Sequence, residues 1–307
     1  MTVPKKVLGP DGCGHHQIRQ VGIARVAERV YGAEGAVPSG RGDRQEGIAM
    51  MRAPSILFVV ACLAGGNGSR AADSVGPVPV LVELFTSEGC SSCPPADAWL
   101  QQIDAVQPVP GARLIVLSEH VDYWNHDGWK DPYSSSSITE RQGDYVRALR
   151  LESPATPQVV VDGTVNLPLN DAQRIRQTLQ QAATTPMVPV RIVSAAIDPG
   201  NSAVLRARIE LDGTSAPHNT DIFGAVALSH AESQVLRGEN GGKHLAHTAV
   251  LQSLTKIGKL EKGKNFGREV EIKLKPGTDP KNVRFIVFAQ ESGPGRVLGA
   301  ALQAAVN

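Results

Sequence analysis

The stretch VELFTSEGCSSCPPAD, residues 82–97, leads from apolar residues through a pair of cysteines to two prolines. The run that contains its start, VPVLVELF over residues 78–85, is nearly continuous and rich in β-branched residues. Such a run is typical of a strand buried on both faces of a sheet. From Pro94 onward the apolar residues recur at helical spacing, and proline is tolerated in a first helical turn. The stretch therefore predicts a strand, a turn and a helix, with both cysteines at the junction.

The spacing of Cys90 and Cys93 favours thiol–disulfide chemistry. A thiolate is stabilised at the positive end of a helix dipole, so we expect Cys90 to be the nucleophile. Cys93, one turn later, would be the less exposed thiol that resolves the mixed disulfide. A static disulfide and half of a metal site are the alternatives. A structural zinc site needs about four ligands, and no second cysteine pair is present to complete it.

A second segment, TPQVVVDG over residues 156–163, accompanies the cysteine stretch, and together the two resemble the thioredoxin-like superfamily. In that fold a cis-proline precedes a central strand and faces the cysteine pair. The resemblance implies that Pro157 is this proline and that the backbone of Thr156 pairs with substrate. An ordinary trans proline at the start of a strand is the alternative for Pro157.

The chain departs from classical thioredoxins around the cysteines. The pair encloses two serines rather than Gly-Pro, and Gly89 rather than tryptophan precedes Cys90. Glu83 matches the buried carboxylate of thioredoxins if the turn holds one extra residue. It would then lie beneath Cys93 and take a proton during exchange. The alternative places Glu83 on a strand near the edge of the sheet.

The chain is more closely similar to the secreted thioredoxin-like family called domain of unknown function 1223. The similarity covers most of residues 78–300 and implies a thioredoxin-like fold and export, without an established activity. Besides the cysteine stretch, it rests on EHVDYW (119–124), GWKDP (128–132), Arg141-Gln142, and RGEN (237–240) with Leu245 and His247.

Residues 50–72, MMRAPSILFVVACLAGGNGSRAA, have the layout of a secretory signal: a positive start, a short apolar run and small residues. We expect the protein to be periplasmic or secreted. The apolar run is too short to span a bilayer. Residues 1–49 are interpreted as an upstream misannotation or an unstructured extension, with translation starting at Met50 or Met51. A lipoprotein anchored at Cys62 is the less favoured alternative.

Two domains are predicted after the signal: a thioredoxin-like α/β domain over residues 77–185 and a mainly-β, sandwich-like domain over residues 187–307. The first would contain a strand at 113–118 and helices at 139–149 and 172–182. The second shows six apolar segments at β-hairpin spacing. These segments are VPVRIVSAAI, AVLRARIEL, DIFGAVALS, REVEIKL, VRFIVFAQES and RVLGAAL.

Histidines suggest a metal-binding alternative. His120 follows the second strand directly, and with Cys90 and Cys93 it could bind copper(I), which prefers soft thiolate and imidazole ligands. Asp122 and His126 are interpreted as residues that satisfy a packed loop. His244 and His247 lack the glutamate of a zincin motif and are expected to orient a loop or contact the first domain.

Composition narrows the function further. The chain of 307 residues has a formal charge of +1 and 4% aromatics, which excludes nucleic-acid binding by bulk electrostatics or stacking. The sequence predicts a thiol–disulfide oxidoreductase or redox adaptor without a cofactor, whose partners are protein thiols or disulfides and a redox partner protein. The second domain would position such a partner or help form a homodimer. A copper-handling or non-catalytic binding module on the same fold is the alternative.

Overall fold

A buried parallel strand pair joined by a helix forms the start of the described fold. The computed structural model describes residues 76–198 and 200–304. The first half contains β1 (Val78–Thr86), α2 (Pro94–Val106), β2 (Ala112–His120), α3 (Ser136–Ala148), β3 (Gln158–Val161), β4 (Val165–Leu167) and α4 (Ala172–Ala182). The second half contains β5 (Val190–Asp198), β6 (Asn201–Leu211), η1 (Gly213–Ser215), β7 (Thr220–Gln234), β8 (His244–Leu260), β9 (Phe266–Lys273), η2 (Pro280–Asn282), β10 (Val283–Gln290) and β11 (Val297–Gln303).

Hydrogen-bonding side chains fix where the helices begin. Ser135 accepts from the Ile138 amide at the start of α3, and Asp171 accepts from the Arg174 amide at the start of α4. These are N-caps, which satisfy amides that have no partner within the helix. The helix predicted at 172–182 is confirmed, whereas α3 begins three residues earlier than the predicted 139.

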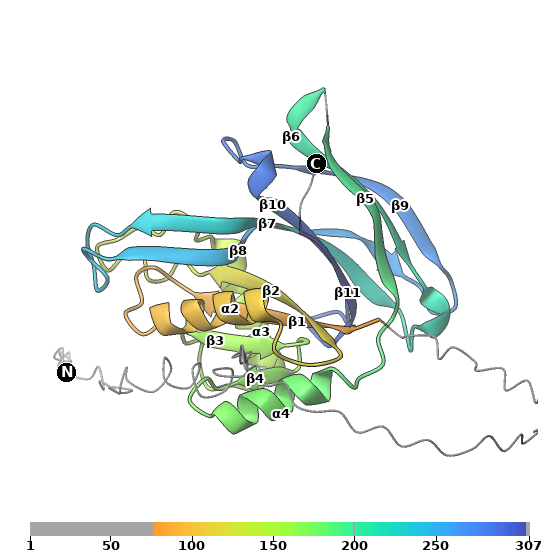
Figure 1. Cartoon of the computed structure of the whole chain (residues 1–307), viewed down its shortest axis with the longest axis horizontal. Coiled ribbons are helices and arrows are strands. Elements are labelled where there is room, and N and C mark those ends of the chain that lie inside the picture. Colours follow the sequence, from red (N-terminus) through yellow and green to blue (C-terminus); the bar gives the residue numbers. More distant parts are fainter. Residues whose placement is uncertain (1–75, 199, 305–307) are drawn as a thin grey trace, which may run out of the picture. The chain divides into compact units, whose positions relative to one another are not determined.

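The strands form two sheets, one of which runs through both halves of the chain. The eight-stranded sheet has the order β11-β10-β7-β8-β2-β1-β3-β4, and the three-stranded sheet has the order β5-β6-β9 (Figure 1). β1 pairs with β2 in parallel and with β3 in antiparallel orientation. β8 joins β2 in parallel through the pairing of Ser118 with Val250. The large sheet is therefore continuous from the first half of the chain into the second.

Side-chain alternation along β1 gives the sheet two separately packed faces. Val80, Val82 and Leu84 pack against α2 and α4. Leu81 and Phe85 point to the opposite face, where they share a core with α3, β10 and β11. Because β10 is four positions away from β1 in the sheet, the sheet curls so that its far strands return over β1 and β2.

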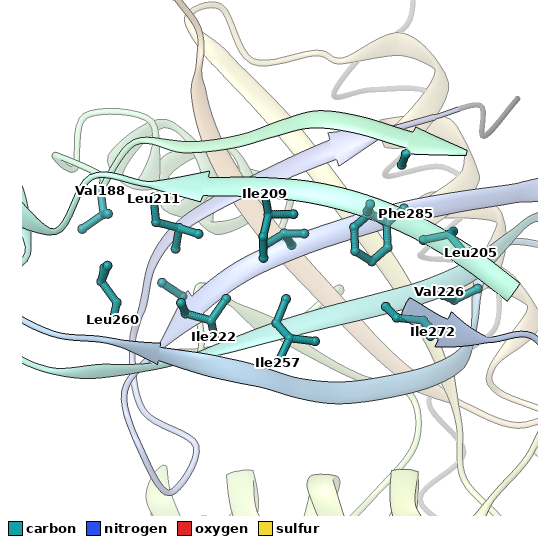
Figure 2. Packing of buried hydrophobic residues seen from close by; sticks show 14 of the residues in the cluster. Val188, Leu205, Ile209, Leu211, Ile222, Val226, Ile257, Leu260, Ile272 and Phe285 are labelled. Carbon is teal, nitrogen blue, oxygen red and sulfur yellow. The ribbon is translucent and has the colours of Figure 1, made fainter. Parts of the chain in front are cut away.

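The three-stranded sheet encloses a further core against β7, β8 and β10 (Figure 2). Leu205, Ile209 and Leu211 of β6 point into it, with an alternation that leaves Arg206 and Arg208 exposed. From the other side, Phe285 of β10 enters the same core, while its neighbour Ile286 belongs to the core beneath β1. One strand thus serves two cores through its two faces.

The predicted boundary between residues 185 and 187 falls in the connection from α4 to β5, but the core beneath β1 contains residues from both sides of it. Residues 77–304 lie in one compact unit. The six predicted strands of the second half are present, and β8, which was not predicted, supplies the link to β2. Within the described residues, no helix combines the length and apolar character required to cross a membrane. The predicted signal at 50–72, the extension at 1–49 and Cys62 lie outside the described residues.

Candidate functional site

A disulfide joins Cys90 and Cys93 between the end of β1 and the start of α2. Cys93, rather than Cys90, is the N-cap residue of the helix, and Pro94 and Pro95 form its first positions. The Cys93 amide donates to the Cys90 carbonyl at 3.2 Å, so a turn places Cys90 just before the helix. The exposed fractions of the two residues are 1% and 0%. Both cysteines are therefore buried, including the predicted nucleophile.

The predicted docking residues lie beside the disulfide. The Thr156–Pro157 peptide bond is cis, as the resemblance implied. The Thr156 carbonyl oxygen is 3.7 Å from the sulfur of Cys90, and the Ser92 hydroxyl is 3.4 Å from the same sulfur. Trp124 donates to the Thr156 hydroxyl at 2.8 Å, which orients the segment before the proline. The structure thus brings four of the five predicted site residues together: Cys90, Cys93, Thr156 and Pro157.

A groove of about 540 Å³ opens next to this site. Its surface is mainly apolar, and its lining includes leucines and prolines from the segment before β3, from β4 and from the segment after β4. β4 is the last strand of the sheet, so the groove runs along a free sheet edge. The lining residues are Ser92, Pro95, Leu151, Glu152, Ser153, Ala155, Thr156, Pro157, Gln158, Asn166, Leu167, Pro168, Leu169 and Asn170.

The tip of the β7–β8 hairpin, residues 235–243, packs against the turn that holds the cysteines. Asn240 is fully buried, and its side-chain amide donates to the carbonyls of Glu88 (2.8 Å) and Cys90 (2.9 Å). Glu239 accepts from the Ser91 amide at 3.0 Å. We call residues 235–243 the cap. The RGEN segment singled out in the sequence is therefore the part of the second half that encloses Cys90.

Close packing explains the glycine before Cys90. A Cβ atom at Gly89 would come within 2.9 Å of Cβ of Trp124, a distance that real Cβ atoms do not adopt. Trp124 also holds Thr156, so this contact fixes the cysteine turn against the segment before Pro157. The tryptophan expected before the cysteine in classical thioredoxins would not fit here unless the 121–135 loop moved.

A group of buried charged residues lies behind the cysteine turn; we call Glu88, Asp97, His120, Asp131 and His247 the His247 cluster. Asp131 lies 2.7 Å from Nδ1 of His120 and accepts from the Glu88 amide at 2.9 Å. His247, on β8, approaches Glu88 Oε1 at 3.4 Å and Asp97 Oδ1 at 3.7 Å. Its ring contacts that of His120, with centroids 4.7 Å apart. All five residues are at least 95% buried.

The electrostatics of this cluster favour a charged His247. Burial alone would lower the pKa of its imidazole, but hydrogen-bonding and charge interactions with Asp97 and Glu88 outweigh it and raise the pKa to about 10. For Asp131, burial is likewise outweighed by the charge and hydrogen bond of His120 and by two backbone amides, so its pKa is lowered. The prediction that His247 contacts the first half of the chain is confirmed, whereas His244 is exposed and pairs with Glu232.

Glu83 does not join the cysteines. It lies on β1 among the odd-numbered residues, which face away from α2, and it is fully buried rather than near a sheet edge. It accepts hydrogen bonds from Arg141 and from Tyr145, the latter at 2.6 Å. Glu119 is 3.5 Å from the same arginine, and its pKa is raised well above the usual value by burial and by the charge of Glu83. We call Glu83, Glu119, Arg141 and Tyr145 the Arg141 cluster.

The residues suggested as copper ligands, Cys90, Cys93 and His120, do not form an assembled metal site. In the part of the chain that the structure describes, no three residues of the His, Cys, Asp and Glu types form a group that could hold a metal ion. Nδ1 of His120 is already paired with Asp131. Asp122 accepts from the Thr139 hydroxyl at 2.6 Å, in keeping with a role in the loop, and His126 is exposed beside Asp127.

Sequence reasoning missed Asn240, Glu88 and Asp97 as site residues. One available signal was the alternation of side chains along β1: Leu84 faces α2, so Thr86, two residues further on, points toward the same side and toward Asp97. The pairing of these residues with β8 could not be read from the sequence, because β8 itself was not predicted.

Comparison with known proteins identifies the family. The model of the family described as protein of unknown function (DUF1223) matches residues 81–290. This match spans more than half of the chain, so the chain belongs to that family. None of the curated proteins matches it.

Two solved structures are similar to the chain. Protein AGR_C_4864 from Agrobacterium tumefaciens is 26% identical, with a TM-score of 0.58 over 75% of this chain and 96% of that one. HBP35 of Porphyromonas gingivalis is 15% identical, with a TM-score of 0.56 over 75% of this chain and 76% of that one. The likeness to HBP35 shows the fold alone.

Proposed function

We propose that this protein is an exported thiol–disulfide oxidoreductase or redox adaptor of the thioredoxin-like class, acting through Cys90 and Cys93. The observation that carries the proposal is the disulfide at a strand-to-helix junction, with the Thr156 carbonyl 3.7 Å from the Cys90 sulfur. A structural disulfide alone would not need a docking segment beside it. The β1-α2-β2 unit supports a thioredoxin-like arrangement of this half of the chain.

The exchange follows from the oxidised state of the pair. A substrate thiolate attacks the Cys90 sulfur, the Cys90–Cys93 bond breaks, and Cys93 leaves with the electron pair. The second substrate thiolate then attacks the substrate sulfur of the mixed disulfide, and Cys90 leaves as a thiolate. Two electrons pass from the substrate dithiol to the protein, and the reverse sequence reduces a substrate disulfide. The start of α2 stabilises the Cys90 thiolate in both directions.

The groove supplies a place for the partner. An extended protein segment that carries a thiol or disulfide can lie along this groove beside the partly exposed Leu151 and Pro168, with its backbone toward Thr156. Ser92 belongs both to the groove lining and to the surroundings of the Cys90 sulfur, so the groove leads to the reacting atom. Apolar binding of this kind selects unfolded or flexible partners, whose hydrophobic side chains are accessible.

Export is the second part of the proposal. It rests on the signal-like stretch at residues 50–72, and a disulfide between Cys90 and Cys93 fits an oxidising compartment. Fractionation of cells that produce the full-length chain, followed by mass spectrometry of the mature N-terminus, tests it. A mature protein that begins near residue 73 is expected, and a cytoplasmic protein that retains residues 50–72 would contradict it.

Reduction of insulin by dithiothreitol, with the purified protein as catalyst, tests the exchange activity. We expect turnover by the wild type, none by Cys90→Ser, and a trapped mixed disulfide with Cys93→Ser. A copper(I) competition titration on the same samples addresses the alternative class. Tight copper binding by a wild type that catalyses no exchange would overturn the proposal.

A further inference from the structure

We propose that Asp97, held in place by His247, accepts the proton of the Cys93 thiol when Cys93 attacks the mixed disulfide. This inference rests on the proposed thiol–disulfide exchange and assigns the proton-transfer group of the same site. It replaces Glu83, which faces the other side of the sheet and is bonded to Arg141. The assignment makes β8, from the second half of the chain, a part of the exchange machinery.

The position of Asp97 on α2 brings it to Cys93. The Asp97 amide donates to the Cys93 carbonyl at 3.1 Å, so the helical repeat already holds between these residues. Residues four apart on a helix share a face, with Cβ atoms about 5–6 Å apart. Both side chains are buried, Cys93 fully and Asp97 to 95%. A proton leaving the Cys93 sulfur therefore has a carboxylate on the same helix face and little water to reach instead.

The hydrogen bonding of Asp97 leaves one oxygen available. Oδ2 accepts from the Thr86 hydroxyl at 3.2 Å. Oδ1 is buried and makes no hydrogen bond among the described residues; its contact with His247 Nδ1, at 3.7 Å, is an ion pair. Buried polar atoms are usually hydrogen-bonded, so this carboxylate oxygen keeps the capacity to accept a proton one turn from Cys93.

His247 places a positive charge beside Asp97. Its ring nitrogens lie 3.7 Å from Asp97 Oδ1 and 3.4 Å from Glu88 Oε1, distances of ion pairs rather than of short hydrogen bonds. With its pKa raised to about 10, His247 is positively charged at neutral pH. Only a carboxylate, and not a carboxylic acid, can take the Cys93 proton, and a neighbouring cation favours the carboxylate form.

Further titratable groups surround this pair and complete its charge balance. They come from the turn after β1, from β2 and from the loop before α3, and they are Glu88, His120, Asp131 and Tyr133. Asp131 offsets His120, and Glu88 shares His247 with Asp97. The cluster therefore keeps one positive side chain directly beside Asp97 through the neutral pH range.

The proton-transfer step balances as follows. The Cys90 thiolate attacks a substrate disulfide, and one substrate sulfur leaves with the electron pair. The Cys93 thiol then gives its proton to Asp97 Oδ1 while its sulfur attacks Cys90, and the second substrate sulfur leaves as a thiolate. That thiolate takes a proton from solvent or, through the opened site, from Asp97. The substrate disulfide is reduced, and the protein disulfide is formed.

Single-turnover reaction of the reduced protein with 5,5′-dithiobis(2-nitrobenzoate) separates the two steps. The first release of thionitrobenzoate reports attack by Cys90, and the second reports resolution by Cys93. For Asp97→Asn we expect an unchanged first phase and a second phase slowed about 100-fold or more, as for loss of a general base. Asp104→Asn is the matched control. Asp104 lies on the same helix, two turns further on, and pairs with Arg284. The Asp104→Asn substitution therefore removes a largely buried charge from α2 without contacting the cysteines.

A second variant keeps the test independent of folding effects. His247→Gln leaves Asp97 buried beside no positive charge, so the second phase should slow at pH 6 and recover toward pH 9 relative to wild type. A normal second phase in folded Asp97→Asn, or an equal slowing in Asp104→Asn, overturns the assignment while the exchange function stands. A wild type that releases no thionitrobenzoate and reduces no insulin overturns both.

Discussion

The two faces of the same sheet carry two buried ionic groups that differ in how firmly they are tied. In the Arg141 cluster, Glu83 accepts from Nε of Arg141 at 2.9 Å and from Tyr145 at 2.6 Å. In the His247 cluster, the contacts of His247 with its two carboxylates are longer, 3.4 and 3.7 Å. Both clusters contain buried carboxylate oxygens without a hydrogen bond among the described residues, on Glu119 in the first and on Glu88 and Asp97 in the second. What differs is the cation: Arg141 donates directly to Glu83, as in a structural ion pair, whereas His247 contacts its carboxylates only at ion-pair distances.

The two clusters also differ in which segments of the chain contribute their residues. The Arg141 cluster consists of residues from the first half, with Gln290 added from β10. The His247 cluster is complete only when β8 lies against the turn after β1 and the start of α2. The cap, which precedes β8, covers Cys90 from the same hairpin. The second half of the chain is therefore arranged to enclose the cysteine site rather than to stand apart from it.

The largest effect is expected from removing the centre of the Arg141 cluster. Arg141→Met leaves Glu83 and Glu119 buried without their cation, which should lower the free energy of unfolding by about 3–5 kcal/mol. Urea unfolding measures it. Arg147→Met, on the same helix with an exposed partner, should change stability by less than about 1 kcal/mol. Thiol exchange rates of Arg141→Met, measured where it is folded, should match wild type, and a selective loss of exchange would contradict the structural role.

The charge of His247 should instead be detectable in the pH dependence of the free energy of unfolding. The folded-state pKa of His247 is raised to about 10, so its contribution is present below the unfolded value near 6.5 and is lost as pH rises through 10. By this linkage the wild type should lose roughly 3 kcal/mol between pH 7 and pH 10 beyond what His247→Gln loses. Chemical unfolding at a series of pH values tests it, with His244→Gln as control. Parallel curves for wild type and His247→Gln would show that His247 is uncharged in the folded protein.

Loosening the cap should expose the cysteines. Asn240→Ala removes two hydrogen bonds to the carbonyls beside Cys90, which should lower stability by about 1–2 kcal/mol. Because opening of the cap becomes easier by the same energy, alkylation of Cys90 by iodoacetamide in the reduced protein should accelerate about 10-fold. Gln234→Ala, in the same hairpin but bonded only to Lys243, is the matched control. An unchanged alkylation rate in Asn240→Ala would mean that partners reach Cys90 through the groove alone.

Local signals in the sequence were sufficient for the first half of the fold. The apolar run of β1 and the prolines of α2 gave the strand, turn and helix, and Asp171 marks the start of α4. Four of the predicted site residues meet because they flank these elements. Glu83 was predicted to lie beneath Cys93 because it was matched with the buried carboxylate of thioredoxins. A shift of one position along a strand moves a side chain to the other face of the sheet, so this match could not fix the face on which Glu83 lies.

Hydrophobic periodicity was not sufficient to predict how the strands of the second half pair. Its strands were recognisable, but their partners were not, because hydrogen bonding between β2 and β8 joins residues more than 120 positions apart. β8 also mixes histidine, threonine, glutamine and lysine with its apolar residues, and Ala249 adopts a positive φ of 52° within it. These interruptions hide the alternation on which strand prediction depends. Asn240 and His247 could be found as site residues only through that pairing.

The smallest effect concerns the hydroxyl that holds Asp97. Thr86→Val is nearly isosteric and removes only the hydrogen bond to Asp97 Oδ2, so we expect a stability loss of about 1 kcal/mol. Asp97 retains its contact with His247, but its orientation toward Cys93 is less restricted. Resolution by Cys93 should therefore slow only a few-fold, far less than in Asp97→Asn, while attack by Cys90 is unchanged. The two-phase release of thionitrobenzoate measures both steps. A loss in Thr86→Val as large as that in Asp97→Asn would show that the Thr86 hydroxyl, rather than the charge of the carboxylate, sets the rate of resolution, and would contradict the role assigned to Asp97.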